Sequence, residues 1–179
     1  HKVMRWIDDK GRARLGYEPT DNHIAGLDVA DGGIDRNALA IRQDIILRDV
    51  AEWGERDTGV TTRKTIALIQ HIKNIKVMYD NIGIGSGVKS EYNRLVDEKL
   101  IDNINKNIKF VGWNAGGAVV DPYERLIPND EESILNRDMF GNMKAQAWWS
   151  VRTRFYKTWQ HVTQGIHYPI DEMISIDST

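Results

Sequence analysis

The sequence has no cysteine among its 179 residues. This absence excludes disulfide bonds, zinc sites built on thiolates and cysteine nucleophiles, and it agrees with a reducing cytoplasm. No apolar run approaches the roughly 18–20 residues that a membrane-spanning helix needs, so we expect no membrane partner. The chain also lacks a Gly-x-x-x-x-Gly-Lys-Ser/Thr phosphate loop, which argues against a P-loop ATPase within it.

An excess of positive charge is missing as well. The chain has 24 lysines and arginines against 26 aspartates and glutamates, for a formal net charge of −2. The field of the whole molecule therefore does not attract nucleic acid. A nucleic-acid-binding role would need a local basic face, or metal cations that reverse the sign of an acidic site.

Hydrophobic patterning predicts the element order β-β-β-α-β-α-β-loop-α. Strands are predicted at 23–30, 38–42 and 45–53, and their short connections favour an antiparallel meander. A helix over 61–72, a strand at 76–80, a helix over 86–100 and a strand at 108–112 follow. A loop rich in glycine, proline and asparagine over 113–136 leads into a long helix over 140–161.

This order predicts an α/β fold, a ribonuclease H-like mixed sheet of at least five strands flanked by helices. A purely parallel sheet would need a helix between every pair of strands, and the region 35–53 has no room for one. Residues 1–22 are predicted as an irregular lead-in and 23–179 as a single domain. The apolar stripe of the last helix includes Trp148, Val151 and Phe155, and we expect Trp148 in particular to lie in the core.

Two aspartates end apolar strands. Asp28 follows Leu27 late in the first strand, and Asp80 follows Tyr79 at the end of the fourth. A carboxylate buried there needs a hydrogen bond, a partner charge or a metal. Because the predicted sheet places these strands side by side, both carboxylates should emerge at the same edge. Hard oxygen ligands without histidine or cysteine suit Mg²⁺ or Mn²⁺.

Each aspartate has a simpler interpretation when it is taken alone, because an aspartate at a strand end often caps a helix or forms a turn. The glycine-rich loops that follow, at 31–33 and 83–87, favour the metal site because they let backbone, phosphate and water approach closely. The second loop could instead cradle a phosphate at the start of the next helix. Asp31 either reaches a metal-bound water or caps its turn, and we favour the turn.

Three segments in order resemble a known family. Gly26 to Ala38 resembles the first-acid motif of the nuclease of phage terminase large subunits, and Asp80 to Val88 resembles the second-acid motif with its Gly-x-Gly-x-Gly loop. Phe140 to Trp149 is similar to the family's helix after the long loop. The resemblance covers Ile24 to Tyr156, which is most of the chain.

The resemblance implies a metal-dependent endonuclease of a viral DNA-packaging motor, which hydrolyses phosphodiesters of duplex DNA to cut concatemeric genomes. It implies two Mg²⁺ or Mn²⁺ ions, with Asp28 bridging both and Asp80 holding one. The implied partners are double-stranded DNA, the ATPase domain of the same motor, the small terminase subunit and the portal. The implied location is the cytoplasm of the infected bacterial host.

The family's third acid, in a Ser-Pro-x-x-Ala-Asp-Ala-like segment, has no counterpart in this sequence. Asp171 and Asp177 are weak candidates, because an aspartate in a tail is more often solvated. The resemblance also implies DNA contacts through the backbone. The candidate residues are basic side chains on the long helix and before the second-acid strand: Arg152, Arg154, Lys157, Lys73 and Lys76.

Two other functions fit the same pattern. A ribonuclease H-like junction resolvase or transposase-type nuclease would also use an aspartate cluster. From a different class, an actin-like ATP-binding domain has a first strand that ends in an aspartate followed by glycines. That architecture normally needs two such domains and about twice this length. A third possibility is a catalytically inactive scaffold, since the third acid is missing.

Overall fold

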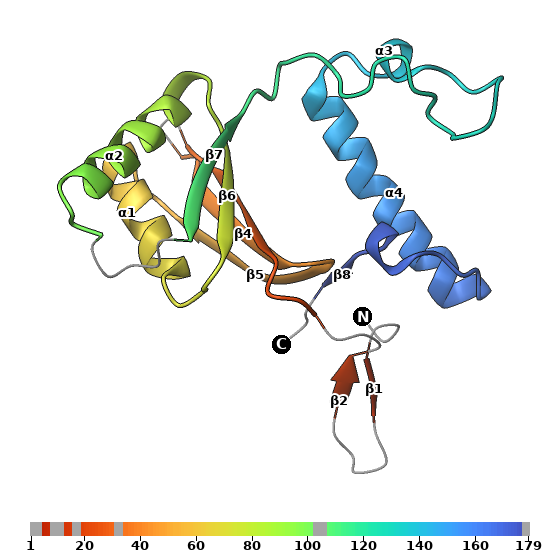
Figure 1. Ribbon diagram of the computed structural model, residues 1–179, viewed down its shortest axis with the longest axis horizontal. Coiled ribbons are helices and arrows are strands. Elements are labelled where there is room, and N and C mark those ends of the chain that lie inside the picture. Colours follow the sequence, from red (N-terminus) through yellow and green to blue (C-terminus); the bar gives the residue numbers. More distant parts are fainter. Residues whose placement is uncertain (1–4, 8–12, 16–18, 31–33, 102–106, 177–179) are drawn as a thin grey trace.

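The computed structural model describes residues 5–7, 13–15, 19–30, 34–101 and 107–176. Its centre is a mixed sheet of six strands in the order β7-β6-β3-β4-β5-β8 (Figure 1). The expected α/β class and the sheet of at least five strands are therefore confirmed.

The first three strands of this sheet form the expected meander. β3 (His23–Asp28) pairs antiparallel with β4 (Asn37–Gln43), and β4 pairs antiparallel with β5 (Ile46–Trp53). The turn between β4 and β5 contains Asp44 with φ 46°, a left-handed conformation that aspartate adopts more readily than most residues.

The remaining central strands are reached through helical crossovers. Helix α1 (Thr58–Ile69) begins at Asp57, whose carboxylate accepts a hydrogen bond from the Val60 backbone N–H. It leads into β6 (Ile75–Asp80), which is parallel to β3. The short η1 (Gly83–Gly85) and helix α2 (Ser86–Asp97) then lead to β7 (Ile108–Trp113), which is parallel to β6.

Helices α1 and α2 cover one face of the sheet (Figure 1). The alternation of side chains along each strand sends one set of residues to that face and the other set to the opposite face. The covered face forms the core, which includes Ala25, Leu27, Leu39, Ile41, Val77, Tyr79, Ile69 and Val88. The opposite face carries the even-numbered residues of β3 and β6, and among the described residues no helix packs over these two strands as α1 and α2 do on the core side.

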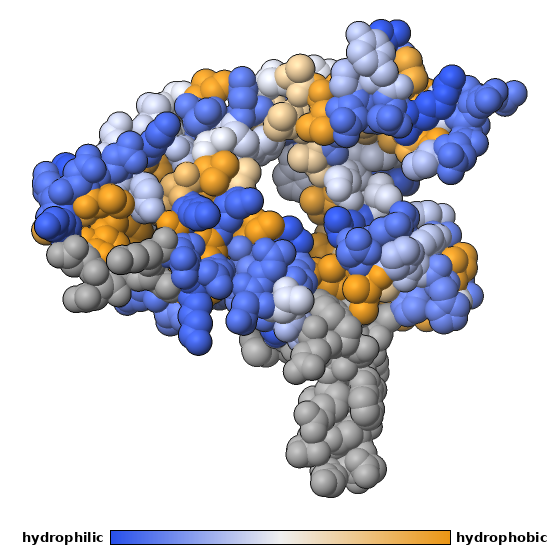
Figure 2. Space-filling view, viewed as in Figure 1, coloured by the Kyte–Doolittle hydropathy of each residue, from blue (hydrophilic) through white to orange (hydrophobic). Residues whose placement is uncertain are grey.

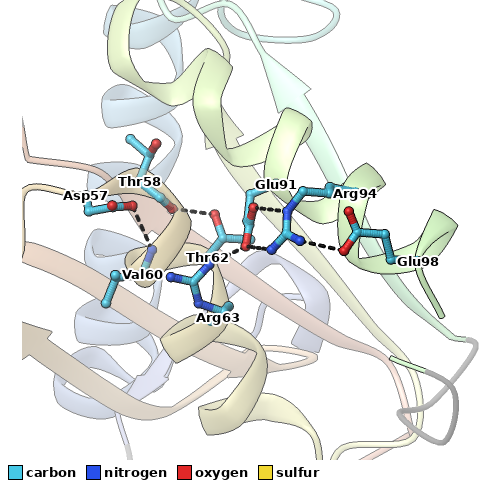
Figure 3. Close-up of polar contacts among 8 residues, drawn as sticks. All are labelled: Asp57, Thr58, Val60, Thr62, Arg63, Glu91, Arg94 and Glu98. Atoms are coloured by element: carbon cyan, nitrogen blue, oxygen red, sulfur yellow. Dashed lines mark hydrogen bonds and ion pairs between the residues drawn. The ribbon is translucent and has the colours of Figure 1, made fainter. Parts of the chain in front are cut away.

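An ion-pair cluster joins the two covering helices (Figure 3). The Glu91 carboxylate on α2 accepts hydrogen bonds at 2.9 Å from Nε and Nη2 of Arg94 and a further one from Arg63 on α1. Arg94 also donates to Glu98 at 2.6 Å. The hydrogen bonds from Arg94, together with the charge and hydrogen bond of Arg63, lower the pKa of Glu91 to about 2.

Some elements were not expected from the sequence. Within the predicted lead-in, β1 (Arg5–Ile7) and β2 (Ala13–Leu15) form a separate two-stranded antiparallel sheet. Near the end of the chain, η2 (Ile170–Glu172) precedes β8 (Ser175–Ile176), which adds to β5 in parallel. Strands this short carry too few residues for a period-2 pattern. The domain boundaries at 22 and 23 stay a prediction.

The long helix differs from expectation in its environment. A short α3 (Asn136–Met139) precedes α4 (Met143–Gln164), which contains no buried residue. Trp148 is 66% exposed, so its expected place in the core is wrong, and Val151 and Phe155 are exposed too. Apolar side chains lie on the surface over the lower part of α4 and the segment after it (Figure 2). Helical periodicity shows an apolar stripe but not whether another element covers it.

None of the helices in the described part of the chain is both long and apolar enough to cross a membrane.

Candidate functional site

Asp28 and Asp80 end two neighbouring parallel strands. The register of β3 and β6 pairs Leu27 with Tyr79, and each aspartate is the next residue along its strand. Neighbouring strands lie about 4.8 Å apart. Since Leu27 and Tyr79 both point into the helix-covered core, the two aspartates point together to the opposite face. The strand register therefore places Asp28 and Asp80 at the same edge of the sheet, as expected from the sequence.

Both aspartates are exposed, which corrects the expectation that they are buried. The sequence shows apolar neighbours along each strand, but those neighbours fill the opposite face of the sheet. No described residue donates a hydrogen bond to the Asp28 side chain, whereas Oδ1 of Asp80 accepts one from the Ile82 backbone N–H at 3.2 Å. The pair is thus open to solvent and to ligands.

The residues paired with Asp28 across the neighbouring strands include a third acid. Asp28 pairs with Ala38, and Ala38 pairs with Glu52 on β5. Glu52 is therefore two strands from Asp28, about 10 Å away. Nε of Arg36 lies 3.3 Å from the Glu52 carboxylate. Among the described residues, no group of three or more His, Cys, Asp or Glu side chains converges on a metal position.

Asn37 fixes the backbone that leaves Asp28. Its side chain is fully buried, and its Oδ1 accepts a hydrogen bond from the Ala30 backbone N–H at 3.0 Å. Its Nδ2 donates to the backbone carbonyls of Glu55 at 2.8 Å and Trp53 at 3.3 Å. One amide thus ties the end of β3 to the end of β5. Asn37 was not expected as a site residue from the sequence, although an asparagine at the start of an apolar strand is a usable signal.

The glycines after Asp80 serve close packing against the chain itself. A Cβ on Gly85 would lie 1.7 Å from the Asp80 carbonyl oxygen, and one on Gly87 would lie 2.4 Å from Oγ1 of Thr58. Gly83 has φ +65°, which favours glycine. We expected these glycines to leave room for a ligand. At Gly85 and Gly87 that room is instead taken by Asp80 and Thr58, and these contacts hold the loop against β6 and α1.

The other acids named from the sequence do not join the pair. Asp171 lies in η2, just before β8, and β8 pairs with Ile46 and Leu47 at the beginning of β5. Because β5 runs in the same direction as β3, its beginning is at the opposite end of the sheet from Asp28. Asp31 and Asp177 lie outside the described residues.

The basic residues named for DNA contact fall into two groups. On α4, Arg154 donates to the backbone carbonyls of Asp171 and Met173, and Lys157 forms an ion pair with Glu172, so both bind the chain's own last segment. The Arg152 guanidinium lies 4.6 Å from the centre of the Trp149 ring. Lys73 and Lys76 lie by β6, at the end away from Asp80. Their role in DNA contact stays a prediction.

Comparison with known proteins separates sequence from fold. No protein-family model matches the sequence, and no curated protein matches it either. Among solved structures, a mutant nuclease domain of the large terminase subunit gp2 of bacterial virus Sf6, with manganese and beta-thujaplicinol, matches with a TM-score of 0.71 and 20% identity. The match covers 90% of this chain and 66% of that one.

This chain has the fold of a phage terminase nuclease domain. A second structure of the nuclease domain of the large terminase subunit gp2 of bacterial virus Sf6 matches with a TM-score of 0.66, and a mutant with calcium matches with 0.65, both at 20% identity. Each comparison covers 90% of this chain and 66% of the other. The terminase-nuclease fold agrees with the ribonuclease H-like arrangement expected from the sequence.

The donor set at the end of β3 and β6 fits a divalent cation. Two carboxylates on neighbouring strands, on one face and open to solvent, offer hard oxygen ligands to one ion or a pair of ions. Carboxylates this close repel each other, and a cation between them offsets the repulsion. Asp28 and Asp80 are the residues that would hold such a metal.

Proposed function

We propose that this chain is a metal-dependent endonuclease of a viral DNA-packaging motor that hydrolyses duplex DNA. The observation that carries the proposal is the position of Asp28 and Asp80, side by side at the ends of β3 and β6 on the open face of the sheet. The likeness in fold to a large terminase nuclease domain supports it, as does the manganese in one of those structures.

In this proposal the carboxylates of Asp28 and Asp80 hold two divalent ions, Mg²⁺ or Mn²⁺. Bound metal at such a site lowers the pKa of a coordinated water and stabilises the charge of the departing oxygen of a phosphodiester. The chain's own residues supply position rather than a nucleophile. Asn37 holds the backbone after Asp28, and Gly85 packs beneath the carbonyl of Asp80, so the two acids stay on rigid strand ends.

The exposure of the pair fits a large substrate. A duplex cannot enter a closed pocket, and it needs a wide surface beside the reacting group. The molecule is hollowed between the sheet and α4 on the side to which the aspartates point (Figure 2). We propose that the backbone of double-stranded DNA lies against this open face.

The test is plasmid cleavage with Mn²⁺ by the unaltered chain, by Asp28→Asn and by Asp80→Asn. Asp97→Asn on α2 is the matched control, because it removes an exposed carboxylate on the other side of the molecule. Both site variants should lose at least about 100-fold in rate, since each removes a ligand of the catalytic ions. Equal cleavage by all four proteins would refute the site. Circular dichroism confirms that each variant is folded.

The same assay separates this function from a junction resolvase. A packaging nuclease should cut linear and branched duplexes at similar rates, because it holds the backbone with little base readout. A strict requirement for a branched substrate would replace the packaging nuclease with a resolvase. Calorimetric binding of ATP would favour the actin-like alternative instead.

The proposed context is a motor in which a separate ATPase domain moves DNA and this domain cuts it. Its partners there would be that ATPase domain, the small terminase subunit and the portal, in the cytoplasm of the infected bacterial host. The absence of a phosphate loop in this sequence fits such a division of work.

A further inference from the structure

The open face of the sheet carries opposite charges at its two ends. Asp28 and Asp80 lie at one end. At the other end Lys76 on β6 pairs with Lys109 on β7, and both side chains lie on the same face as Asp80 because each strand alternates its residues. Lys76 and Asp80 are four residues apart on one strand. At about 3.3 Å per residue, the acidic and basic rows are about 13 Å apart.

A hollow of about 190 Å³ opens beside these lysines. The polar side chains that line it are two lysines, a histidine and three asparagines: Lys76, Lys109, His23, Asn22, Asn74 and Asn107. No described residue in its lining is acidic. Ammonium and amide N–H groups are the donors that phosphate oxygens accept from.

The two lysines have no charge partner within the described residues. Neither Lys76 nor Lys109 forms an ion pair with any residue that the structure describes. Strand pairing holds their backbones about 4.8 Å apart, which places two like charges at neighbouring positions, and an anion between the ammonium groups would offset their repulsion. The arrangement fits an anion better than the empty state.

Positive charge continues along the same row of the sheet. Lys76 pairs with Ile24, which pairs with Arg42 on β4. Burial and the nearby charge of Arg154 lower the pKa of Arg42, so a second arginine lies close to it. Arg42 and Arg154 thus add positive charge beside the lysines. Asp44 partly offsets the charge of Arg42, and Arg154 donates to the carbonyls of Asp171 and Met173, so the two arginines do not line the hollow.

Little protrudes between the acidic and basic rows. The middle row of the face is Val111, Met78, Gly26 and Ala40. A Cβ built on Gly26 meets no atom within 4 Å, so this part of the face is open. A rod-shaped ligand can therefore contact both rows at once.

We propose that the hollow at Lys76 and Lys109 is a phosphate subsite for the backbone of duplex DNA, which spans the open face from there to Asp28 and Asp80. The separation of about 13 Å is close to the ~12 Å width of the major groove of B-DNA. A phosphate in the hollow and a phosphate at the carboxylates therefore border one groove. This inference rests on the proposed nuclease function, because it says where the DNA substrate of that nuclease binds.

The test is binding of a fluorescein-labelled duplex about two helical turns long, followed by anisotropy over a series of salt concentrations in EDTA. The proteins are the full chain, Lys76→Ala, Lys109→Ala, the double variant and Lys89→Ala. Lys89 is an exposed lysine on α2, behind the sheet, and serves as the matched control. Lys76→Arg tests whether charge alone suffices.

Each site variant should bind several-fold more weakly and lower the slope of log K against log salt by about one. Lys89→Ala and Lys76→Arg should keep the slope of the unaltered chain. Unchanged slopes in Lys76→Ala and Lys109→Ala, with melting temperatures equal to that of the control, would overturn the subsite. If Lys76→Ala and Lys109→Ala weakened the binding of inorganic phosphate but left the binding of DNA unchanged, the assignment to DNA would be overturned.

The two proposals fail in different ways. If the chain does not cut plasmid but the slope depends on Lys76 and Lys109, the nuclease function is wrong and the phosphate subsite stands. If Asp28→Asn abolishes cleavage but neither lysine affects the slope, the nuclease function stands and the subsite is wrong.

Discussion

Gly85 packs directly beneath the backbone carbonyl of Asp80. A Cβ at residue 85 would lie 1.7 Å from that oxygen and 2.9 Å from the carbonyl carbon, distances that no real structure tolerates. The glycine loop after β6 is therefore part of what holds Asp80 in place. A side chain larger than hydrogen at this position would have to displace one of these two segments.

Gly85→Ala should move either η1 or the end of β6. We expect a loss of roughly 1–3 kcal/mol in the free energy of unfolding, the usual cost of inserting a methyl group into a packed site. Mn²⁺-dependent cleavage should fall at temperatures where the variant is still folded. Gly54→Ala is the control, because a Cβ at Gly54 meets nothing within 4 Å. Equal stability of the two variants would contradict the packing described here.

Asn37→Asp should uncouple the ends of β3 and β5. The carboxylate keeps an acceptor for the Ala30 N–H but gives no donor to the carbonyls of Trp53 and Glu55. Because this side chain is fully buried, we expect a loss of about 1–3 kcal/mol in urea-induced unfolding at neutral pH. Asn93→Asp, on the exposed side of α2, should change stability little.

Glu91 should make stability depend on pH in the acid range. Its pKa is lowered from 4.5 to about 2 in the folded chain, so the folded state holds the ionised form more strongly than the unfolded state does. The stabilisation is complete above about pH 4.5 and is lost as the pH falls toward 2.

Urea titrations between pH 2 and 5 should therefore show a steeper loss of stability for the unaltered chain than for Glu91→Gln. Arg63 and Arg94 are about half exposed, so solvent screening limits the effect at neutral pH to about 1 kcal/mol for Glu91→Gln. Parallel pH profiles for the two proteins would show that the cluster of Figure 3 contributes nothing through Glu91.

Arg154→Ala should loosen the last described segment more than it weakens DNA binding. The guanidinium donates to the carbonyls of Asp171 and Met173, and these bonds hold η2 and the residue after it against α4. Hydrogen exchange of residues 170–176 should become faster, while the salt slope of DNA binding should change by less than for Lys76→Ala. Arg152→Ala is the control for segment 170–176, because the Arg152 side chain stacks on Trp149 instead. If Arg154→Ala changed the salt slope of DNA binding more than Lys76→Ala does, Arg154 would contact DNA after all.

The sequence predicted the central architecture because local patterns and chain connectivity determine it. The strands that carry Asp28 and Asp80 have clear apolar residues, and a helix between two strands implies a parallel crossover. Their adjacency follows from that connectivity. The family resemblance added the role of the acids, which spacing alone does not give.

The sequence could not show which faces are covered. Apolar residues at Leu27 and Tyr79 suggested buried acids, but burial on one face leaves the next residue on the other. Trp148 was expected in the core because helical spacing cannot reveal a missing partner. The contacts of Asn37 and Gly85 depend on segments distant in sequence or on a close approach within a loop, and no pattern records either.

Helix α4 has no buried residue, and this has a thermodynamic consequence. Trp148 and Trp159 are already 66% and 49% exposed in the folded chain, so unfolding exposes less new apolar area here than at a buried helix. The heat capacity change of unfolding and the urea m-value both follow the area newly exposed to water. The heat capacity change measured by calorimetry and the m-value measured by urea titration should therefore both fall below the values usual for 179 residues.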